Sequence, residues 1–231
     1  MRPDHDGITD VIVKATHVAR TFGSGPSAVV AVYGVSCEVH AGDLIALTGP
    51  SGSGKTTLLH LLAGLDIPTT GTLEWPAIGA HSQLRPGPIA IVFQAPSLMP
   101  PLDVIENVAL PLLLQGIDRR TARGKALEAL CRLDLEFIAA KLPEELSGGQ
   151  AQRVAVARVL AGQPRLILAD EPTGQLDHTS GAIVIDALIA AATETGAALI
   201  VNTHDAAVAH SFDRRWSMSN GRLSAKPTAS C

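Results

Sequence analysis

The octapeptide GPSGSGKT at residues 49–56 constrains this chain more than any other feature. It fits the pattern of two glycines separated by four residues and followed by Lys and Thr. An apolar run at 44–47 precedes it and a helix-favouring stretch at 57–63 follows it, so the loop should join a buried strand to a helix. The glycines let the backbone fold with its N–H groups inward, and the helix adds the positive end of its dipole. This context predicts a phosphate-binding loop and disfavours a Gly/Ser-rich turn that matches by chance.

Two side chains give the loop its chemistry. Lys55 can reach the β- and γ-phosphates of a nucleotide, and the Thr56 hydroxyl can ligate Mg²⁺. The expected ligand is therefore a nucleotide phosphate with its magnesium ion.

The bulk composition excludes several classes of protein. The 231 residues are 46% hydrophobic, which is enough for one sizeable core with a subdomain. A net charge of −4 and an aromatic content of 3% disfavour nucleic acid as a partner. The three cysteines, Cys37, Cys131 and Cys231, have no metal-binding spacing and indicate reduced thiols in the cytosol. We find neither a signal peptide nor an apolar run long enough to span a membrane.

Apolar runs at 44–47, 88–93, 166–169 and 198–201 alternate with helical patterns. This alternation predicts a mainly parallel sheet, whose ligand site lies at the carboxyl ends of the strands. We further expect strands within 9–19 and, as one or two strands, 29–39. Short antiparallel strands within 64–88 and a hairpin at 216–223 complete the expected strands. Helices should fill 95–162, with Asp118 capping one of them, and either Thr179 or Ser180 should cap a later helix.

Four polar residues follow predicted strands at the same sheet edge. Asp170 can organise Mg²⁺ directly or through water, and Glu171 can polarise an attacking water. His204 can donate a hydrogen bond to a γ-phosphate, and Gln94 can ligate Mg²⁺ or water. Taken singly, Asp170 and Glu171 could equally be a surface carboxylate pair, His204 a structural histidine and Gln94 a turn residue. The phosphate-binding loop upstream favours a shared nucleotide site.

A second candidate anion site is the segment Leu146-Ser147-Gly148-Gly149-Gln150, which opens a predicted helix. Its small residues leave backbone N–H groups accessible at the helix start. On its own it would be an ordinary Ser/Gly turn. In this chain it adds a second phosphate-grasping segment, more than simple nucleotide binding needs.

With these motifs in order, the chain resembles the ATPase subunits of ABC (ATP-binding cassette) transporters from about residue 11 to residue 223. The matching motifs are GPSGSGKTT from 49, FQ at 93–94, LSGGQAQR at 146–153, LILADEPTGQLD at 166–177 and NTHD at 202–205. The resemblance implies an α/β P-loop NTPase (RecA-like) parallel-sheet core with an N-terminal antiparallel β subdomain and an inserted α-helical subdomain. It implies one ABC ATPase domain over 1–231. The core would comprise 8–94 and 163–223, the helical signature subdomain 95–162, and the loose termini 1–7 and 224–231.

The resemblance also implies roles for residues. Catalytic roles fall to Lys55, Gln94, Glu171 and His204, and magnesium ligation to Thr56, Gln94 and Asp170. The residues expected to contact ATP are Phe22, Gly49, Pro50, Ser51, Gly52, Ser53, Gly54, Lys55, Thr56, Thr57, Ser147, Gly148, Gly149 and Gln150. Phe22 would stack on adenine, with Tyr33 as a rival.

The family resemblance further implies a head-to-tail homodimer in which Ser147 and Gly149 complete the partner's site and Asp177 lies at the interface. Separate membrane-spanning permease subunits would contact the segment that begins at Gln94, through Pro100, Pro101 and residues 102–108. The protein would then lie in the cytoplasm, peripheral to the inner face of the membrane.

The segments GLDIPTTG, ENVALPLLLQG and ADEPTGQLD resemble the lipoprotein-release, macrolide-efflux and cell-division subgroup. Two departures are the abbreviated stretch 72–87 and Asn202, where the family more often has a β-branched residue. The expected function is transport-coupled hydrolysis of ATP to ADP and phosphate, in export or membrane extraction. The alternative is an ATPase that signals to a membrane partner without transport. A ribosome- or DNA-directed protein is disfavoured by the single cassette, and a binding module without turnover by Glu171 and His204.

Overall fold

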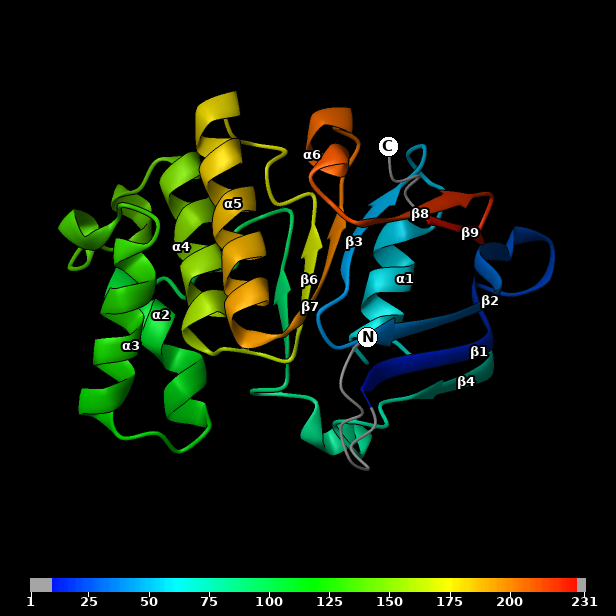
Figure 1. Cartoon of the computed structure of the whole chain (residues 1–231), viewed down its shortest axis with the longest axis horizontal. Helices are drawn as coiled ribbons and strands as arrows, with labels where there is room; N and C mark the ends of the chain where they lie inside the picture. Colours follow the sequence, from blue (N-terminus) through cyan, green and yellow to red (C-terminus); the bar gives the residue numbers. More distant parts are fainter. Residues whose placement is uncertain (1–9, 228–231) are drawn as a thin grey trace, which may run out of the picture.

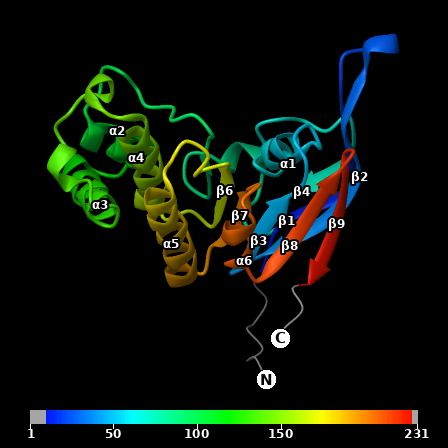
Figure 2. The ribbon, with the colours of Figure 1, turned by 90° about the horizontal axis from the view of Figure 1, so that it is seen from above.

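The structure is a computed structural model, and it describes residues 10–227. Figure 1 shows a group of helices on one side, a central sheet, and a smaller sheet that packs on the far side of helix α1. The view from above separates the same three parts (Figure 2). The expectation for residues 1–7 lies outside the described residues, as does that for 228–231.

The central sheet has six strands in the order β5-β6-β7-β3-β8-β9. Neighbouring strands pair in parallel, except for the last two in this order, which pair antiparallel. The strands are β3 (Leu44–Thr48), β5 (Ile89–Val92), β6 (Leu166–Asp170), β7 (Ala198–Asn202), β8 (Arg214–Ser219) and β9 (Arg222–Pro227). The expected parallel core is confirmed.

The smaller sheet is antiparallel, in the order β2-β1-β4. Its strands are β1 (Val11–Phe22), β2 (Val29–His40) and β4 (Thr70–Glu74). The β1 strand extends past the expected end, because Phe22 still pairs with Val29 across a short 3-10 turn at Gly25–Ser27. The β2 segment is one strand with register shifts. The stretch 64–88, where several short strands were expected, holds one strand, β4, and the 3-10 turn His81–Gln83.

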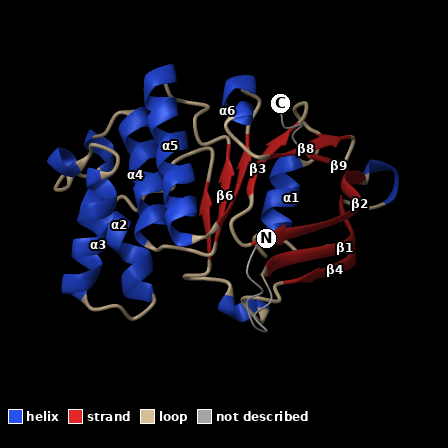
Figure 3. Cartoon of the chain, in the orientation of Figure 1, coloured by secondary structure: helices blue, strands red, loops and turns tan. Residues whose placement is uncertain are grey.

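Six α-helices lie within residues 10–227, and four of them cluster on one side of the sheet (Figure 3). They are α1 (Lys55–Leu62), α2 (Val104–Leu114), α3 (Arg119–Cys131), α4 (Gly148–Ala161), α5 (His178–Thr195) and α6 (Ala206–His210), with 3-10 turns at Glu136–Ile138 and Pro143–Glu145. None of these helices combines the length and apolar character needed to cross a membrane.

Two local predictions need correction. Asp177 caps α5, and neither Thr179 nor Ser180 does, because Asp177 has extended backbone angles and its carboxylate accepts the Ser180 N–H. The tail expected to be loose from 224 onward instead continues β9 to Pro227, because it pairs with β8.

The central sheet separates two hydrophobic clusters. Ile45, Leu168 and Ile200 face α1 and the smaller sheet, together with buried leucines of α1. Ala46, Ala169 and Val201 share the other cluster with α2, α4 and α5. Because side chains alternate along a strand, a residue's position at the strand end decides which layer it faces.

Candidate functional site

The loop between β3 and α1 is shaped by close backbone contacts. A Cβ at Gly49 would lie 2.2 Å from the Met218 carbonyl oxygen, and one at Gly54 would lie 2.0 Å from that of Ala31. Both glycines have positive φ, at 144° and 99°. The loop is therefore packed tightly against β8 and β2, and only glycine fits at either position.

Lys55 and Ser53 show that the interior of the loop is polar. The Lys55 Nζ donates to the carbonyls of Gly49 at 2.8 Å and Pro50 at 3.0 Å, and the side chain is buried. The Ser53 Oγ is buried and has no hydrogen-bond partner among the described residues. Gly54 is the N-cap residue of α1 and provides no side-chain cap, which leaves the first-turn N–H groups of the helix for an anion. Thr56 is exposed in that first turn. This donor set fits a nucleotide phosphate.

The side chains of Asp170 and Glu171 point in different directions at the end of β6. Asp170 is buried, and one of its oxygens accepts a hydrogen bond from the Asn202 side-chain amide. Glu171 has a left-handed φ of 47°, and its N–H donates to the Asn202 carbonyl at 3.0 Å. A non-glycine residue seldom adopts this conformation. The turn sends the Glu171 carboxylate away from the strand while Asp170 stays in it.

Glu171 meets two of the other predicted residues. Gln94 Nε2 donates to its Oε2 at 3.3 Å, and His204 Nδ1 lies 3.5 Å from its Oε1. The His204 side chain is 70% exposed, so it remains accessible to a ligand. The structure therefore brings Gln94, Glu171 and His204 together at one edge of the sheet.

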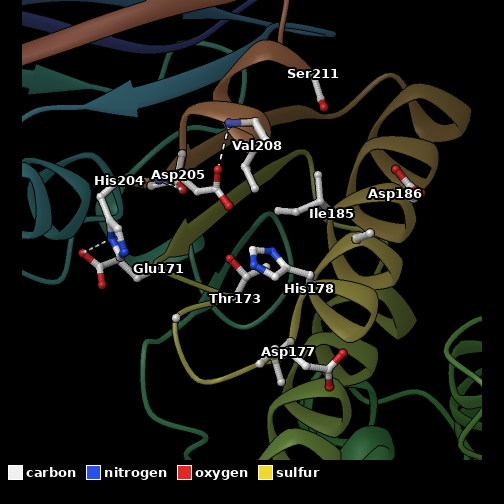
Figure 4. A pocket seen from close by; sticks show the side chains of 16 residues that line it. Glu171, Thr173, Asp177, His178, Ile185, Asp186, His204, Asp205, Val208 and Ser211 are labelled. Atoms are coloured by element: carbon white, nitrogen blue, oxygen red, sulfur yellow. Dashed lines mark hydrogen bonds and ion pairs between the residues drawn. The ribbon is translucent and has the colours of Figure 1, made fainter.

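A cavity of about 380 Å³ adjoins this cluster. Figure 4 shows Glu171 and His204 on one side of it, with α5 and α6 supplying the other walls. Its charged lining includes the carboxylates of Glu171, Asp177, Asp186 and Asp205. Among the described residues that line it, none belongs to loop 49–56. An acidic cavity disfavours a phosphate, so the loop is the better phosphate site.

The segment from Ser147 to Gln150 lies elsewhere in the molecule. Ser147 Oγ accepts the Gln150 N–H at 3.2 Å, while Gln150 Oε1 accepts the Ser147 N–H at 3.0 Å. This is a capping box. Ser147 and Gly148 are exposed, and a Cβ at Gly148 would meet nothing within 4 Å. Helices α4 and α1 lie on opposite sides of the central sheet in both ribbon views (Figures 1 and 2). One chain does not bring the two anion segments together.

The aromatic candidates Phe22 and Tyr33 both lie in the smaller sheet. Phe22 is 43% exposed, with the Arg20 guanidinium 4.6 Å from its ring centroid. Tyr33 is 51% exposed and has Arg222 at 4.0 Å. One arginine guanidinium lies over each ring, and both rings are accessible. The geometry therefore leaves both Phe22 and Tyr33 as candidates for stacking on adenine.

Two residues that hold the site in place, Gln152 and Asn202, were not predicted from the sequence. Gln152, almost fully buried on α4, donates to the Phe93 carbonyl at 3.0 Å and so fixes the backbone next to Gln94. In the sequence, Asn202 stands out only as a departure from the family pattern. A polar residue ending an otherwise apolar strand was the available signal, but its partner Asp170 emerges only from the strand register.

The family described as "ABC transporter" matches residues 32–174. The chain belongs to the ABC transporter family. It is 39% identical to the lipoprotein-releasing system ATP-binding protein LolD of Legionella pneumophila (strain Paris), across 95% of this chain and 100% of the relative. The LolD protein of Bordetella pertussis is 38% identical, across 93% and 96% of the two chains.

Solved structures agree with this assignment. The dimeric bacterial ABC transporter cassette MJ0796 has a TM-score of 0.87 at 35% identity, covering 95% of this chain and all of its own. A post-hydrolysis dimer of the same cassette bound to ADP and Pi gives 0.86. The resemblance drawn from the motifs is thus confirmed, together with the α/β cassette fold. The chain is an ATP-binding ABC transporter subunit and an ATPase.

Proposed function

We propose that this ATPase works as a head-to-tail homodimer that drives separate permease subunits, in export or in extraction of a substrate from the membrane. One observation carries the proposal. The phosphate loop and Glu171 both follow strands at the carboxyl edge of the parallel sheet, while the exposed Ser147–Gln150 segment opens α4, which lies across the sheet from α1. A second copy could supply that segment. The dimeric neighbours support this assembly.

In this proposal each residue acts from its observed position. Lys55 and the N–H groups at the start of α1 bind the β- and γ-phosphates. Thr56, Asp170 and Gln94 would hold Mg²⁺, which when bound neutralises phosphate charge. The carboxylate and hydroxyl oxygens of this set suit a hard cation.

Hydrolysis itself needs a water held near the phosphate. The Glu171 carboxylate, turned out of β6, would orient this water and take its proton. His204 would donate a hydrogen bond to the γ-phosphate. Gln94, which contacts Glu171, begins the segment that would reach the permease through residues 100–108. Binding at the site would thereby be linked to the membrane partner, and the subunit would lie on the inner face of the membrane.

The substitution Glu171→Gln tests the assigned base. An amide cannot accept the proton, so turnover should fall about 10²- to 10⁴-fold while ATP binding persists. We expect an ATP-bound dimer to accumulate, measured by light scattering after size-exclusion chromatography. Since isolated subunits can turn over slowly, the co-purified membrane partner should be present in the ATPase assay. Hydrolysis at the parental rate would contradict the role of Glu171.

Export and signalling differ in what the membrane partner does. The complex should be reconstituted in lipid vesicles carrying a lipid-modified protein, because the relatives are named for lipoprotein release. ATP-dependent release of that protein supports extraction. ATP hydrolysis without release would favour the signalling alternative.

A further inference from the structure

The side chain of Asn202 links the ends of the two central strands. Strands β6 and β7 pair in parallel, with Asp170 directly opposite Asn202. The Asn202 Nδ2 donates to Asp170 Oδ1, and the Asn202 carbonyl accepts the Glu171 N–H. A single residue therefore contacts both acidic residues of the site, one through its side chain and one through its backbone.

The sheet layer places this pair next to the phosphate loop. Along β6 and β7, Leu168 and Ile200 face the cluster that contains the α1 leucines. Asp170 and Asn202 lie two residues further along, so alternation puts their side chains on that same face. Helix α1 starts directly after the loop. The amide and the carboxylate therefore lie on the α1 face of the sheet, and Asn202 pairs with Leu47, two residues before the loop.

The amide has a second feature that packing alone does not explain. Asn202 is 1% exposed, and its Oδ1 is buried without a hydrogen-bond partner among the described residues. A buried polar atom left unpaired is unfavourable, whereas a β-branched residue would fill this strand end with no such penalty. The unpaired oxygen is therefore an acceptor that remains available in the site.

We propose that Asn202 is a positioning residue for the magnesium-binding carboxylate of Asp170. Its amide holds Oδ1 of Asp170, so that the other carboxylate oxygen is left for the metal, and its own Oδ1 accepts a hydrogen bond from a water in the site. This inference rests on the proposed function, because it takes Asp170 as a magnesium ligand. Residues that orient a metal ligand typically change metal affinity when they are replaced.

The test compares ATP affinity with Mg²⁺ and with EDTA, by calorimetry, in a Glu171→Gln background that does not turn over. The ratio of the two affinities is the magnesium-dependent gain. Asn202→Val removes the amide and keeps a strand-forming side chain of similar size. This gain should fall about tenfold, while the affinity measured in EDTA stays within about twofold of the parent.

Asn202→Leu keeps the branched shape and removes the amide donor without adding a buried charge. The magnesium-dependent gain should fall as far as in Asn202→Val, because no donor then holds Oδ1 of Asp170. A role of Asn202 in shape alone would leave this variant unaffected, so it also serves if Asn202→Val does not fold. Val201→Thr is the matched control, since it places a buried hydroxyl in the adjacent residue on the opposite face. It should lower the melting temperature of nucleotide-free protein and leave the ratio at its parental value.

The outcomes separate this inference from the proposed function. A parent without any magnesium-dependent gain would overturn both the magnesium site and the role of Asn202. A parental gain that both Asn202 variants retain would overturn the role of Asn202 alone. Equal loss in Val201→Thr would assign the effect to weakened packing and would also overturn it.

Discussion

Helices α1 and α4 both begin with small residues, yet their first turns differ. Helix α4 is closed by its own capping box, in which Ser147 and Gln150 satisfy each other's backbone N–H groups. Helix α1 has no side-chain cap, and the buried Lys55 lies beside its start. The α1 start therefore needs a ligand to complete it, whereas the α4 start is partly satisfied by its own cap and is exposed. The α1 start is one half of a site, and the α4 start is a surface suited to contact with another molecule.

The glycines differ in the same way. Gly54 is required inside the chain, because a Cβ there would lie 2.0 Å from a β2 carbonyl. A Cβ at Gly148 would meet nothing within 4 Å among residues 10–227. No contact within this part of the chain accounts for the small residue at 148, which is consistent with an approaching partner.

Gly54→Ala should have the largest effect. The new Cβ meets backbone, which cannot move aside as a side chain can, and φ is strongly positive. We expect the free energy of unfolding to fall by about 3 kcal/mol and ATP binding to be lost. Urea denaturation and calorimetry measure the two effects. Gly148→Ala is the paired variant and should change stability by less than about 0.5 kcal/mol. Equal destabilisation by both would remove the contrast between the two helix starts.

Mixed dimers should give the next largest effect. A Lys55→Ala chain combined with a Ser147→Ala chain contains one composite site with both lesions and one with neither. The ATPase activity of the mixture should therefore rise well above that of either parent alone. Isolation of the mixed dimer with two affinity tags confirms that it forms. No gain in that species would count against sites shared between subunits.

The parts predicted from sequence are those set by local pattern. The apolar runs before Gly49, Gln94 and Asp170 each form a strand of the central sheet, because they are long enough and bounded by turn residues. Their shared edge follows from parallel pairing. The loop motif itself then predicts both its backbone and its chemistry.

The parts that escaped prediction depend on partners remote in sequence. The hydrogen bond from Asn202 to Asp170 requires the register of β6 and β7. The β9 strand continues through polar residues and ends at Pro227, which an edge strand tolerates. Asp177 and Ser180 have similar capping propensities, so only the backbone angles choose between them.

A smaller effect should come from the capping box itself. Ser147→Ala removes the oxygen that accepts the Gln150 N–H, and loss of such a cap costs about 1 kcal/mol. Chemical denaturation of the monomer measures this. Ser147→Asp, which keeps an acceptor, should recover most of the stability. A stability loss of several kcal/mol would mean that the segment is part of the internal packing and is not a free surface.

The smallest predicted effect concerns the start of α5, where a charge replaces the hydroxyl cap of α4. Hydrogen bonds from the Ser180 backbone and hydroxyl lower the pKa of Asp177 below its ordinary value of 3.8. A carboxyl whose pKa is lowered by folding stabilises the protein above that ordinary value, and this contribution is lost as the pH falls through the lowered pKa. Asp177→Asn keeps an amide acceptor for the cap and should reduce the acid-dependent loss of melting temperature.

Asp118, whose pKa is lowered by the Thr121 hydroxyl and N–H at the start of α3, is the matched control. Asp118→Asn should reduce the acid dependence similarly and leave ATP turnover unchanged. Only Asp177→Asn should also slow turnover, because Asp177 is proposed to lie at the dimer interface; equal turnover in the two variants would contradict that position.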